Sequence, residues 1–339
     1  MRIIFMGTPD FSVGTLEMLI QAGHEIVLAV TQPDKPKGRH KAMQPPPVKE
    51  AALAHGIEVY QPRRVREPEC IEYLRRLHPD IIVVVAFGQI LPKEILELPP
   101  KGCINVHASL LPKYRGAAPI QWAVINGEPV TGVTTMRMDE GLDTGDIILK
   151  TEVPLQEGET GGTLFERLAK TGAELCIQTI QAIQQGTATY TPQDHSSATH
   201  TTIIKKQLGQ LDWAKPAKEL ERLIRGLNPW PSAYTYLDGK TLKIWKANVQ
   251  EENPGTLSTA AGEQLTGTPE THAPDKTGSL SARNGYQPGT ITAITRNTIS
   301  VQTGQGTLIL EELQLEGKKR MPTEAFLRGF PLEPGHKLG

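Results

Sequence analysis

Short apolar runs alternate with helix-like patterns over the first 190 residues. Ile81–Val85 is apolar at every position, which is typical of a strand buried on both faces of a parallel sheet. Between Leu164 and Ile183, apolar residues recur at helical spacing and predict a long closing helix. This alternation predicts an α/β domain with a Rossmann-like, doubly wound, mostly parallel sheet. The clearest predicted strands are 2–6, 26–31, 81–86, 104–107, 133–138 and 147–150.

The pattern changes after the long helix. Residues 191–207 are rich in Thr, Ser and His and are predicted to form a linker. A helix is predicted at Ala217–Gly226, and the short strands with glycine turns that follow it predict a small β-barrel. These strands are expected at 234–237, 242–245, 290–294, 298–303 and 308–313. We therefore predict one domain at 1–190 and a second at 208–339.

One segment of the second domain has a different composition. Residues 251–287 contain mostly Gly, Thr, Ser, Pro and Glu, with few large apolar side chains. Such a segment cannot bury enough apolar surface to order itself. We interpret it as a disordered surface insertion in a turn of the barrel, with a functional tail as the alternative.

Composition narrows the class of protein. A chain of 339 residues is long for one core, which agrees with two domains. The net charge of −1 gives no general attraction to nucleic acid, so any such contact depends on local patches. The three cysteines lack metal-ligand spacing, which argues against a zinc site or a disulfide framework and suits a reducing cytoplasm. No apolar run reaches membrane-spanning length, so we expect a soluble, cytoplasmic protein without a membrane partner.

The end of the first strand bears on cofactor use. It reads Gly7-Thr8-Pro9-Asp10 and lacks the three-glycine fingerprint of dinucleotide-binding folds. The chain is therefore not predicted to be a dehydrogenase. Gly7 and Thr8 are still expected beside a ligand cleft, because open α/β sheets bind ligands at the carboxyl ends of their strands.

Candidate chemistry is concentrated at the end of the strand 104–107. Asn105 and His107 are two residues apart, so both side chains should project from the same face. The amide could donate to a developing oxyanion, and the imidazole could donate or relay a proton. Asp143, in a loop between Gly141 and Gly145, could orient the imidazole or help remove a proton. The three residues predict acyl transfer without a nucleophilic side chain.

Each of these residues also has a plainer interpretation. His107 could be a packed residue, Asn105 could cap a strand, and Asp143 could be a turn residue that bonds its own backbone. The following Ser-Leu-Leu-Pro run at 109–112, and a turn that should open a helix near residue 120, favour the catalytic interpretation.

The run Asn-x-His-x-Ser-Leu-Leu-Pro at 105–112, with Asp143 downstream, resembles the folate-dependent formyltransferase family. Segments 5–11, 228–234 and 313–321 resemble the methionyl-tRNA branch of that family. The resemblance covers nearly the whole chain outside the insertion. It implies that the C-terminal barrel is of the oligonucleotide-binding (OB-like) type and contacts tRNA.

The resemblance also implies a reaction: transfer of a formyl group from 10-formyltetrahydrofolate to the α-amine of methionine on initiator methionyl-tRNA, for translation initiation. Asn105 and His107 would stabilise the tetrahedral oxyanion and Asp143 would orient water or imidazole, with no metal and no covalent enzyme intermediate. The chain is expected to act as a monomer. The implied folate contacts are Ser109, Leu110, Leu111 and Pro112, and we expect Phe87, Gly88 and Gln89 to line the same pterin pocket.

Residues 32–49 form a loop that is too long and proline-rich for a plain strand-to-helix connection. Basic side chains outnumber its one acid, Asp34, although a solvated loop would also fit this composition. In the family that the chain resembles, the corresponding insertion enters the acceptor arm of initiator tRNA, and Arg39 matches the arginine implicated there. The residues predicted to bind tRNA are Lys35, Lys37, Arg39 and Lys41.

Two alternatives remain at this stage. One is a formyltransferase for a small amine, such as glycinamide ribonucleotide or an amino-sugar nucleotide, which would not need both the basic loop and the barrel. The other is a folate- or RNA-binding module without turnover. The presence of all three polar residues weighs against a non-catalytic module.

Overall fold

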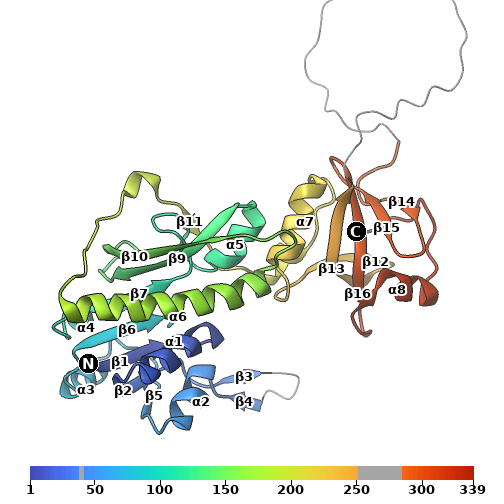
Figure 1. Cartoon of the computed structure of the whole chain (residues 1–339). Coiled ribbons are helices and arrows are strands. Elements are labelled where there is room, and N and C mark those ends of the chain that lie inside the picture. The colour runs from blue at the N-terminus through green and yellow to red at the C-terminus, as the bar shows by residue number, and fades with distance from the viewer. Residues whose placement is uncertain (38–41, 251–284) are drawn as a thin grey trace, which may run out of the picture. The chain divides into compact units, whose positions relative to one another are not determined.

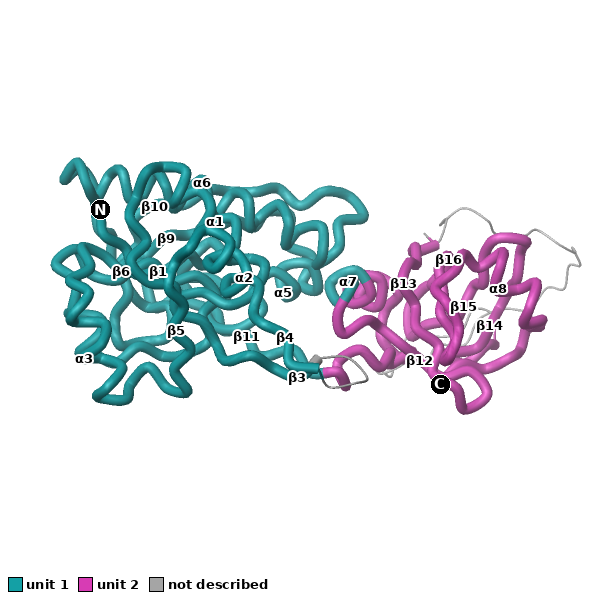
Figure 2. Tube along the Cα trace, turned by 90° about the horizontal axis from the view of Figure 1, so that it is seen from below, with its two compact units in different colours: residues 1–205, 225–229 teal, residues 206–224, 230–339 magenta. Residues whose placement is uncertain are grey.

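The structure is a computed structural model in which residues 1–37, 42–250 and 285–339 are described (Figure 1). The chain folds into two compact units (Figure 2). The first comprises residues 1–205 with 225–229, and the second comprises 206–224 with 230–339.

A mostly parallel sheet forms the centre of the first unit. Among the described residues its strand order is β10-β9-β7-β6-β1-β2-β5. The pairs from β7 to β5 are parallel, whereas β9 is antiparallel to both β7 and β10. This confirms the predicted fold class. The strands are β1 (Arg2–Gly7), β2 (Glu25–Val30), β5 (Val59–Tyr60), β6 (Ile81–Val85), β7 (Cys103–His107), β9 (Val130–Arg137) and β10 (Ile147–Pro154).

Helices cover both faces of this sheet. Ile104 and Val106 of β7 join an apolar cluster with α1, α2 and α6, whereas Cys103 joins a second cluster with α3 and α4. Because side chains alternate along a strand, Asn105 and His107 lie on the face of Cys103 and away from α6. The helices are α1 (Asp10–Gln21), α2 (Pro47–Ala54), α3 (Pro68–Arg76), α4 (Lys93–Leu96), α5 (Pro119–Asn126) and α6 (Gly161–Gln185).

The strand order reverses beside β1, which lies between β6 and β2. Segments from three strand ends meet there: the Thr8 hydroxyl donates to the carbonyl of Phe87 at 3.1 Å and accepts from the backbone N–H of Gln32 at 3.3 Å. Gly7 has a packing role, because a Cβ there would lie 2.8 Å from the Cβ of Ser12. Open α/β sheets commonly bind ligands where the strand order reverses in this way.

Most of the expected linker belongs to the first unit. Residues 191–205 are counted with it, and η1 (His195–Ser197) lies within them. Thr191 forms a bridge with Ile147, and β11 (His200–Thr201) pairs with β8 (Arg115–Gly116). The polar residues that led to the linker prediction form hydrogen bonds with the segment after Pro112. For example, the Oγ1 of Thr199 accepts from the backbone N–H of Tyr114.

The second unit is antiparallel. The described strands have the order β12-β13-β16-β15-β14, and β17 pairs with β16. The C-terminal residues connect the outer strands: the Ile291 N–H of β14 donates to the carbonyl of His336 at 2.8 Å, and the Gly339 N–H donates to the carbonyl of Tyr236 in β12 at 3.0 Å. The elements are η2 (Lys206–Gly209), α7 (Ala217–Gly226), β12 (Ala233–Leu237), β13 (Lys240–Gln250), β14 (Ile291–Ile294), β15 (Ile299–Gln302), β16 (Thr307–Leu315), β17 (Met321–Pro322) and α8 (Thr323–Gly329).

The predicted insertion at 251–287 separates β13 from β14, and residues 251–284 of it lie outside the described residues. Across the described part of the chain, no helix has the length and apolar character needed to cross a membrane.

Candidate active site

The predicted catalytic residues His107 and Asp143 meet at the end of β7. The Nε2–H of His107 donates to the carbonyl of Tyr114 at 2.9 Å. Its other ring nitrogen, Nδ1, lies 3.7 Å from Oδ2 of Asp143. Because the carbonyl can only accept, Nε2 carries a proton and Nδ1 is the nitrogen that can exchange one. The imidazole is buried, which restricts its orientation.

Asn105 completes this group from the same strand face. It is buried, and among the described residues its side-chain amide has no hydrogen-bond partner. A buried amide normally finds a partner within the protein. The Asn105 amide is therefore available to donate to a substrate oxygen.

The Asp143 carboxylate is held by a distant segment. Its Oδ2 accepts from the backbone N–H of Gly116 at 2.8 Å. The role of a turn residue falls instead to Asp139, whose Oδ1 accepts from the Gly141 N–H at 3.0 Å and from the Thr144 hydroxyl at 2.6 Å. Asp143 itself has a φ of 53°, in the left-handed region. The loop therefore presents its second aspartate, not its first, to His107.

The two glycines of this loop are needed by its packing. A Cβ on Gly145 would lie 1.8 Å from the carbonyl oxygen of Arg137, and one on Gly141 would lie 1.9 Å from Oγ1 of Thr144. Both distances are far below van der Waals contact, so a larger residue would force the backbone to move at Gly145 and the Thr144 side chain to move at Gly141. The two glycines that drew attention to this loop in the sequence allow its segments to pack closely together.

The predicted folate-binding segment 109–112 is held by hydrogen bonds to neighbouring segments. The Ser109 hydroxyl donates to the carbonyl of Lys113 at 2.7 Å, and the Leu111 N–H donates to Oγ1 of Thr134 at 3.1 Å. The Lys150 ammonium donates to the carbonyl of Leu111, and burial lowers the pKa of Lys150. Ser109 and Leu111 are buried, whereas Leu110 and Pro112 keep part of their surface exposed. The sequence analysis did not identify Lys150 as a residue that holds this segment.

Residues 87–89 follow β6 at the same edge of the sheet. Phe87 is buried in the core, Gly88 is exposed, and Gln89 accepts from the Val65 N–H at 2.9 Å through Oε1. Two exposed apolar side chains flank the predicted site residues: Ile90 is 80% exposed and Leu142 is 58% exposed. Sequence reasoning missed both, although an apolar residue next to polar loop residues at a strand end was the available signal.

Part of the basic loop forms a hairpin in which β3 (Lys35–Lys37) pairs with β4 (Ala42–Gln44). Lys35 and Lys37 lie in β3, whereas Arg39 and Lys41 lie outside the described residues.

A basic residue near the end of the loop is neutralised. The Lys49 ammonium lies 2.9 Å from both carboxylate oxygens of Asp34. Gln61 donates to the same carboxylate at 2.8 Å. Hydrogen bonds from Gln61 and then from Lys49 lower the pKa of Asp34. Lys49 is therefore paired with an acid, whereas Lys35 in β3 is exposed.

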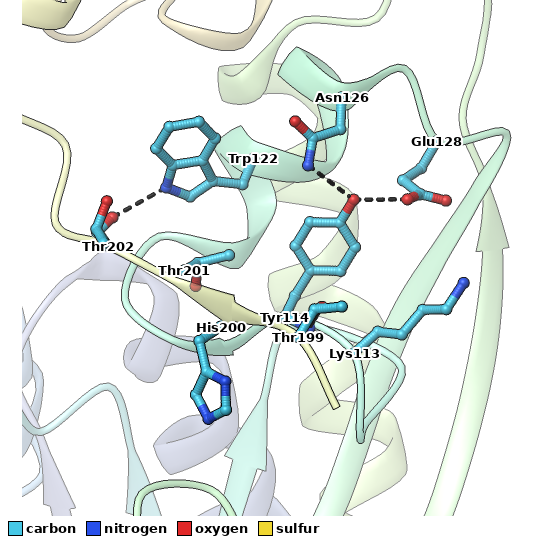
Figure 3. Close-up of a pocket in the computed structure, with 9 residues that line it drawn as sticks. All are labelled: Lys113, Tyr114, Trp122, Asn126, Glu128, Thr199, His200, Thr201 and Thr202. Carbon is cyan, nitrogen blue, oxygen red and sulfur yellow. Dashed lines mark hydrogen bonds between the residues drawn. The ribbon is translucent and has the colours of Figure 1, made fainter. Parts of the chain in front are cut away.

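A hollow of about 340 Å³ lies beside the segment that anchors His107 (Figure 3). The Tyr114 hydroxyl donates to the carboxylate of Glu128 at 2.6 Å and accepts from the amide of Asn126 at 3.0 Å. Burial, followed by the bond to Glu128, raises the pKa of Tyr114 to about 12. The ring of Tyr114 thus lines this hollow while its carbonyl holds the imidazole. Within the described ranges, no group of three or more His, Cys, Asp or Glu side chains could hold a metal.

Comparison with known families agrees with this geometry. The family model for formyl transferase matches residues 1–180, and the model for the formyl transferase C-terminal domain matches residues 203–331. The chain belongs to the formyl transferase family.

Individual relatives indicate the branch of the family to which the chain belongs. A methionyl-tRNA formyltransferase of Agathobacter rectalis is 60% identical over 99% of this chain and 98% of its own length. A methionyl-tRNA formyltransferase of Lachnospira eligens is 52% identical over the full length of both chains. Within its family, the chain belongs with the methionyl-tRNA formyltransferases. The fold also resembles the N-formyltransferase of Helicobacter canadensis in complex with folinic acid and dTDP-3-aminofucose, with a TM-score of 0.61 and 17% identity over 91% of this chain and 98% of that one.

Proposed function

We propose that this enzyme transfers the formyl group of 10-formyltetrahydrofolate to the α-amine of methionine esterified to initiator tRNA. The observation that carries the proposal is the arrangement of Asn105, His107 and Asp143 around one face of β7. The full-length likeness to methionyl-tRNA formyltransferases supports the choice of acceptor. The buried, free cysteines suit a reaction in a reducing cytoplasm.

The chemistry follows from the available groups. The amine attacks the formyl carbon, a C–N bond forms, and the carbonyl oxygen becomes an oxyanion. The Asn105 amide and the protonated Nδ1 of His107 donate to that oxyanion, and the Asp143 carboxylate balances the imidazolium charge. The bond from carbon to N10 of the folate then breaks. As that bond breaks and the carbonyl re-forms, Nδ1 of His107 gives its proton to N10, and the proton released by the acceptor amine returns to Nδ1, so that the proton count balances.

Exposed apolar surface supports a folate site at this edge. Leu110 and Pro112 follow His107 in the sequence and are partly exposed. Ile90 and Leu142, in two other loops, are largely exposed. A flat pterin and benzoyl group would be desolvated against such side chains. Gly88, which has no side chain and a φ of 81°, leaves its backbone accessible to polar groups of the ring.

Basic side chains on both units support an RNA acceptor. On the first unit, β3 contains Lys35 and Lys37, and Arg39 and Lys41 follow them in the sequence. On the second unit, Lys243 and Arg320 flank the indole of Trp245, with Nζ 5.5 Å and Cζ 4.7 Å from the ring centroid, and Arg320 also forms an ion pair with Glu312 at 2.5 Å. Cationic groups beside an aromatic face suit contact with phosphates and bases. We propose that this β unit is an OB-like RNA-binding domain.

The test is a formyl-transfer assay on the purified chain with 10-formyltetrahydrofolate as donor. We expect transfer to methionyl initiator tRNA, and little to elongator methionyl-tRNA, glycinamide ribonucleotide or an amino-sugar nucleotide. Transfer to a small amine without transfer to tRNA would overturn the proposed acceptor. Folate binding without transfer to any amine would overturn the catalytic proposal.

A further inference from the structure

Gln193 lies behind the loop that carries Asp143. Only 6% of its surface is exposed, although its segment has the composition of a linker. Its side-chain Nε2 donates to the carbonyl of Asp143 at 2.9 Å and to the carbonyl of Gly145 at 2.7 Å. One amide therefore holds the backbone on both sides of Thr144.

Arg115 fixes the orientation of that amide. Its guanidinium is 3% exposed and donates to Oε1 of Gln193 through Nε at 3.1 Å and through Nη2 at 2.7 Å. The remaining donors reach Nδ1 of His195 at 3.2 and 3.3 Å. Because a guanidinium only donates, the oxygen of Gln193 must face Arg115 and its NH₂ group must face the loop.

The same two segments also hold the Asp143 side chain. Gly116, next to Arg115, binds the Asp143 carboxylate through its N–H at 2.8 Å. The strand Arg115–Gly116 pairs with His200–Thr201, which follows Gln193 in the chain. Asp143 is thus held at its carboxylate from one segment and at its carbonyl from the other. Its φ of 53° lies in the left-handed region, which is uncommon for residues other than glycine, and these hydrogen bonds help to hold the loop in that conformation.

We propose that Gln193, oriented by Arg115, is a positioning residue for the reaction and sets the distance between the Asp143 carboxylate and Nδ1 of His107. This inference rests on the proposed function, because the carboxylate matters only if His107 and Asp143 act together. Gln193 does not touch the reacting atoms. Its effect passes through the loop backbone.

The test compares Gln193→Met with the wild type. Methionine has similar length and volume but cannot donate to the two carbonyls. A misplacement of about 1 Å near the reacting groups can lower a rate by roughly 10²-fold, so we expect kcat to fall by about 10- to 100-fold. KM for methionyl-tRNA and for the folate should stay within about threefold, because the Gln193 side chain is buried behind the loop and offers little surface to a substrate.

A double-mutant cycle separates positioning from general stability. In an Asp143→Ala background, Gln193→Met should cause no further loss of kcat, because the group that it positions is gone. Gln302→Met is the matched control, since Gln302 also donates to two carbonyls, those of Thr303 at 3.0 Å and Gly306 at 3.4 Å, in the second unit. The control should keep wild-type kcat.

Two kinetic results would overturn the inference. One is an unchanged kcat in folded Gln193→Met, and the other is an equal fractional loss with and without the Asp143 carboxylate. Should Gln193→Met fail to fold, Arg115→Lys provides the second variant, because it keeps the charge but loses the fork that orients Gln193.

A crystal structure of the variant tests the inference independently of the acceptor. We expect the separation of Nδ1 and Oδ2 to exceed the present 3.7 Å. An unchanged separation would overturn the positioning role. Failure of the wild type to formylate tRNA would overturn only the proposed function.

Discussion

The imidazole of His107 is bound through Nε2 to the carbonyl of Tyr114, 2.9 Å away, and so presents Nδ1 to Asp143. The 3.7 Å between Nδ1 and the carboxylate is too long for a hydrogen bond but within the range of an ion pair. A substrate oxygen near Nδ1 would therefore meet a donor whose charge the carboxylate balances. In this geometry the protein backbone, and not Asp143, selects the ring nitrogen that carries the fixed proton.

We expect alanine at Asn105, His107 or Asp143 to lower kcat by roughly 10²- to 10⁴-fold, the range for positioned donors and acid–base groups. The reason is that each variant removes one group from the transition state while the buried clusters of the sheet remain intact. Single-turnover formylation, with circular dichroism to verify folding, measures the effect. Near-wild-type turnover by folded His107→Ala would contradict the proposed chemistry.

Arg39→Ala tests the predicted tRNA-binding role of the basic segment 32–49. A guanidinium can hold a phosphate or a base edge through two parallel hydrogen bonds, and loss of such a contact costs about 1–3 kcal/mol. We expect a lower kcat/KM for methionyl-tRNA, a flatter salt dependence and unchanged folate binding. Arg76→Ala, an exposed arginine on α3, is the matched control. Equal losses for both variants would contradict a specific tRNA contact at Arg39 and favour the alternative of a solvated loop.

The Asp34–Lys49 pair predicts a pH dependence of stability. The folded state lowers the pKa of Asp34, so the pair stabilises the protein above the unfolded pKa, and this contribution disappears as pH falls through the lowered value. Asp34→Asn should therefore be less stable than the wild type at neutral pH, and the difference should shrink in acid. Urea titrations at several pH values measure it. A difference that does not change with pH would contradict the assignment.

Burial should protect the thiols of Cys70, Cys103 and Cys176 from reaction with thiol reagents. It raises the pKa of Cys103 and of Cys176 to about 12 and also raises the pKa of Cys70. Since the thiolate is the reactive form, less of it is present at pH 8 than for a free cysteine. We expect a thiol reagent to leave the native protein unmodified for minutes and to label all three residues after denaturation. Rapid labelling of the native protein would show that one of the thiols is exposed.

Replacing residues 251–284 with a short Gly-Ser turn should preserve melting temperature and formylation. The flanking strands β13 and β14 pair with β16 and β15, so their hydrogen bonds do not depend on the insertion. Loop-closure entropy also changes slowly with length. Differential scanning calorimetry and the transfer assay measure the two effects. Loss of activity with an intact fold would assign the insertion a function.

Local pattern was enough to predict the main strands and some of the helices of this protein. The fully apolar run Ile81–Val85 became a central strand, and the helix predicted at Ala217–Gly226 has those bounds in the structure. The period of two placed Asn105 and His107 on one face, as expected. These features were readable because hydrophobic periodicity and strand alternation repeat over a few neighbouring residues.

Only the tertiary structure decided which distant groups meet. Gln193 lies 50 residues from Asp143 and 78 from Arg115, and its segment has the composition of a linker. The bond from Gly116 to Asp143, which distinguishes it from the turn-forming Asp139, likewise spans 27 residues. Hydrogen bonds of this kind depend on where the fold brings each backbone group. A single polar residue carries no periodic signal of its future partner, so the sequence predicted the candidate reacting groups and the fold determined what holds them in place.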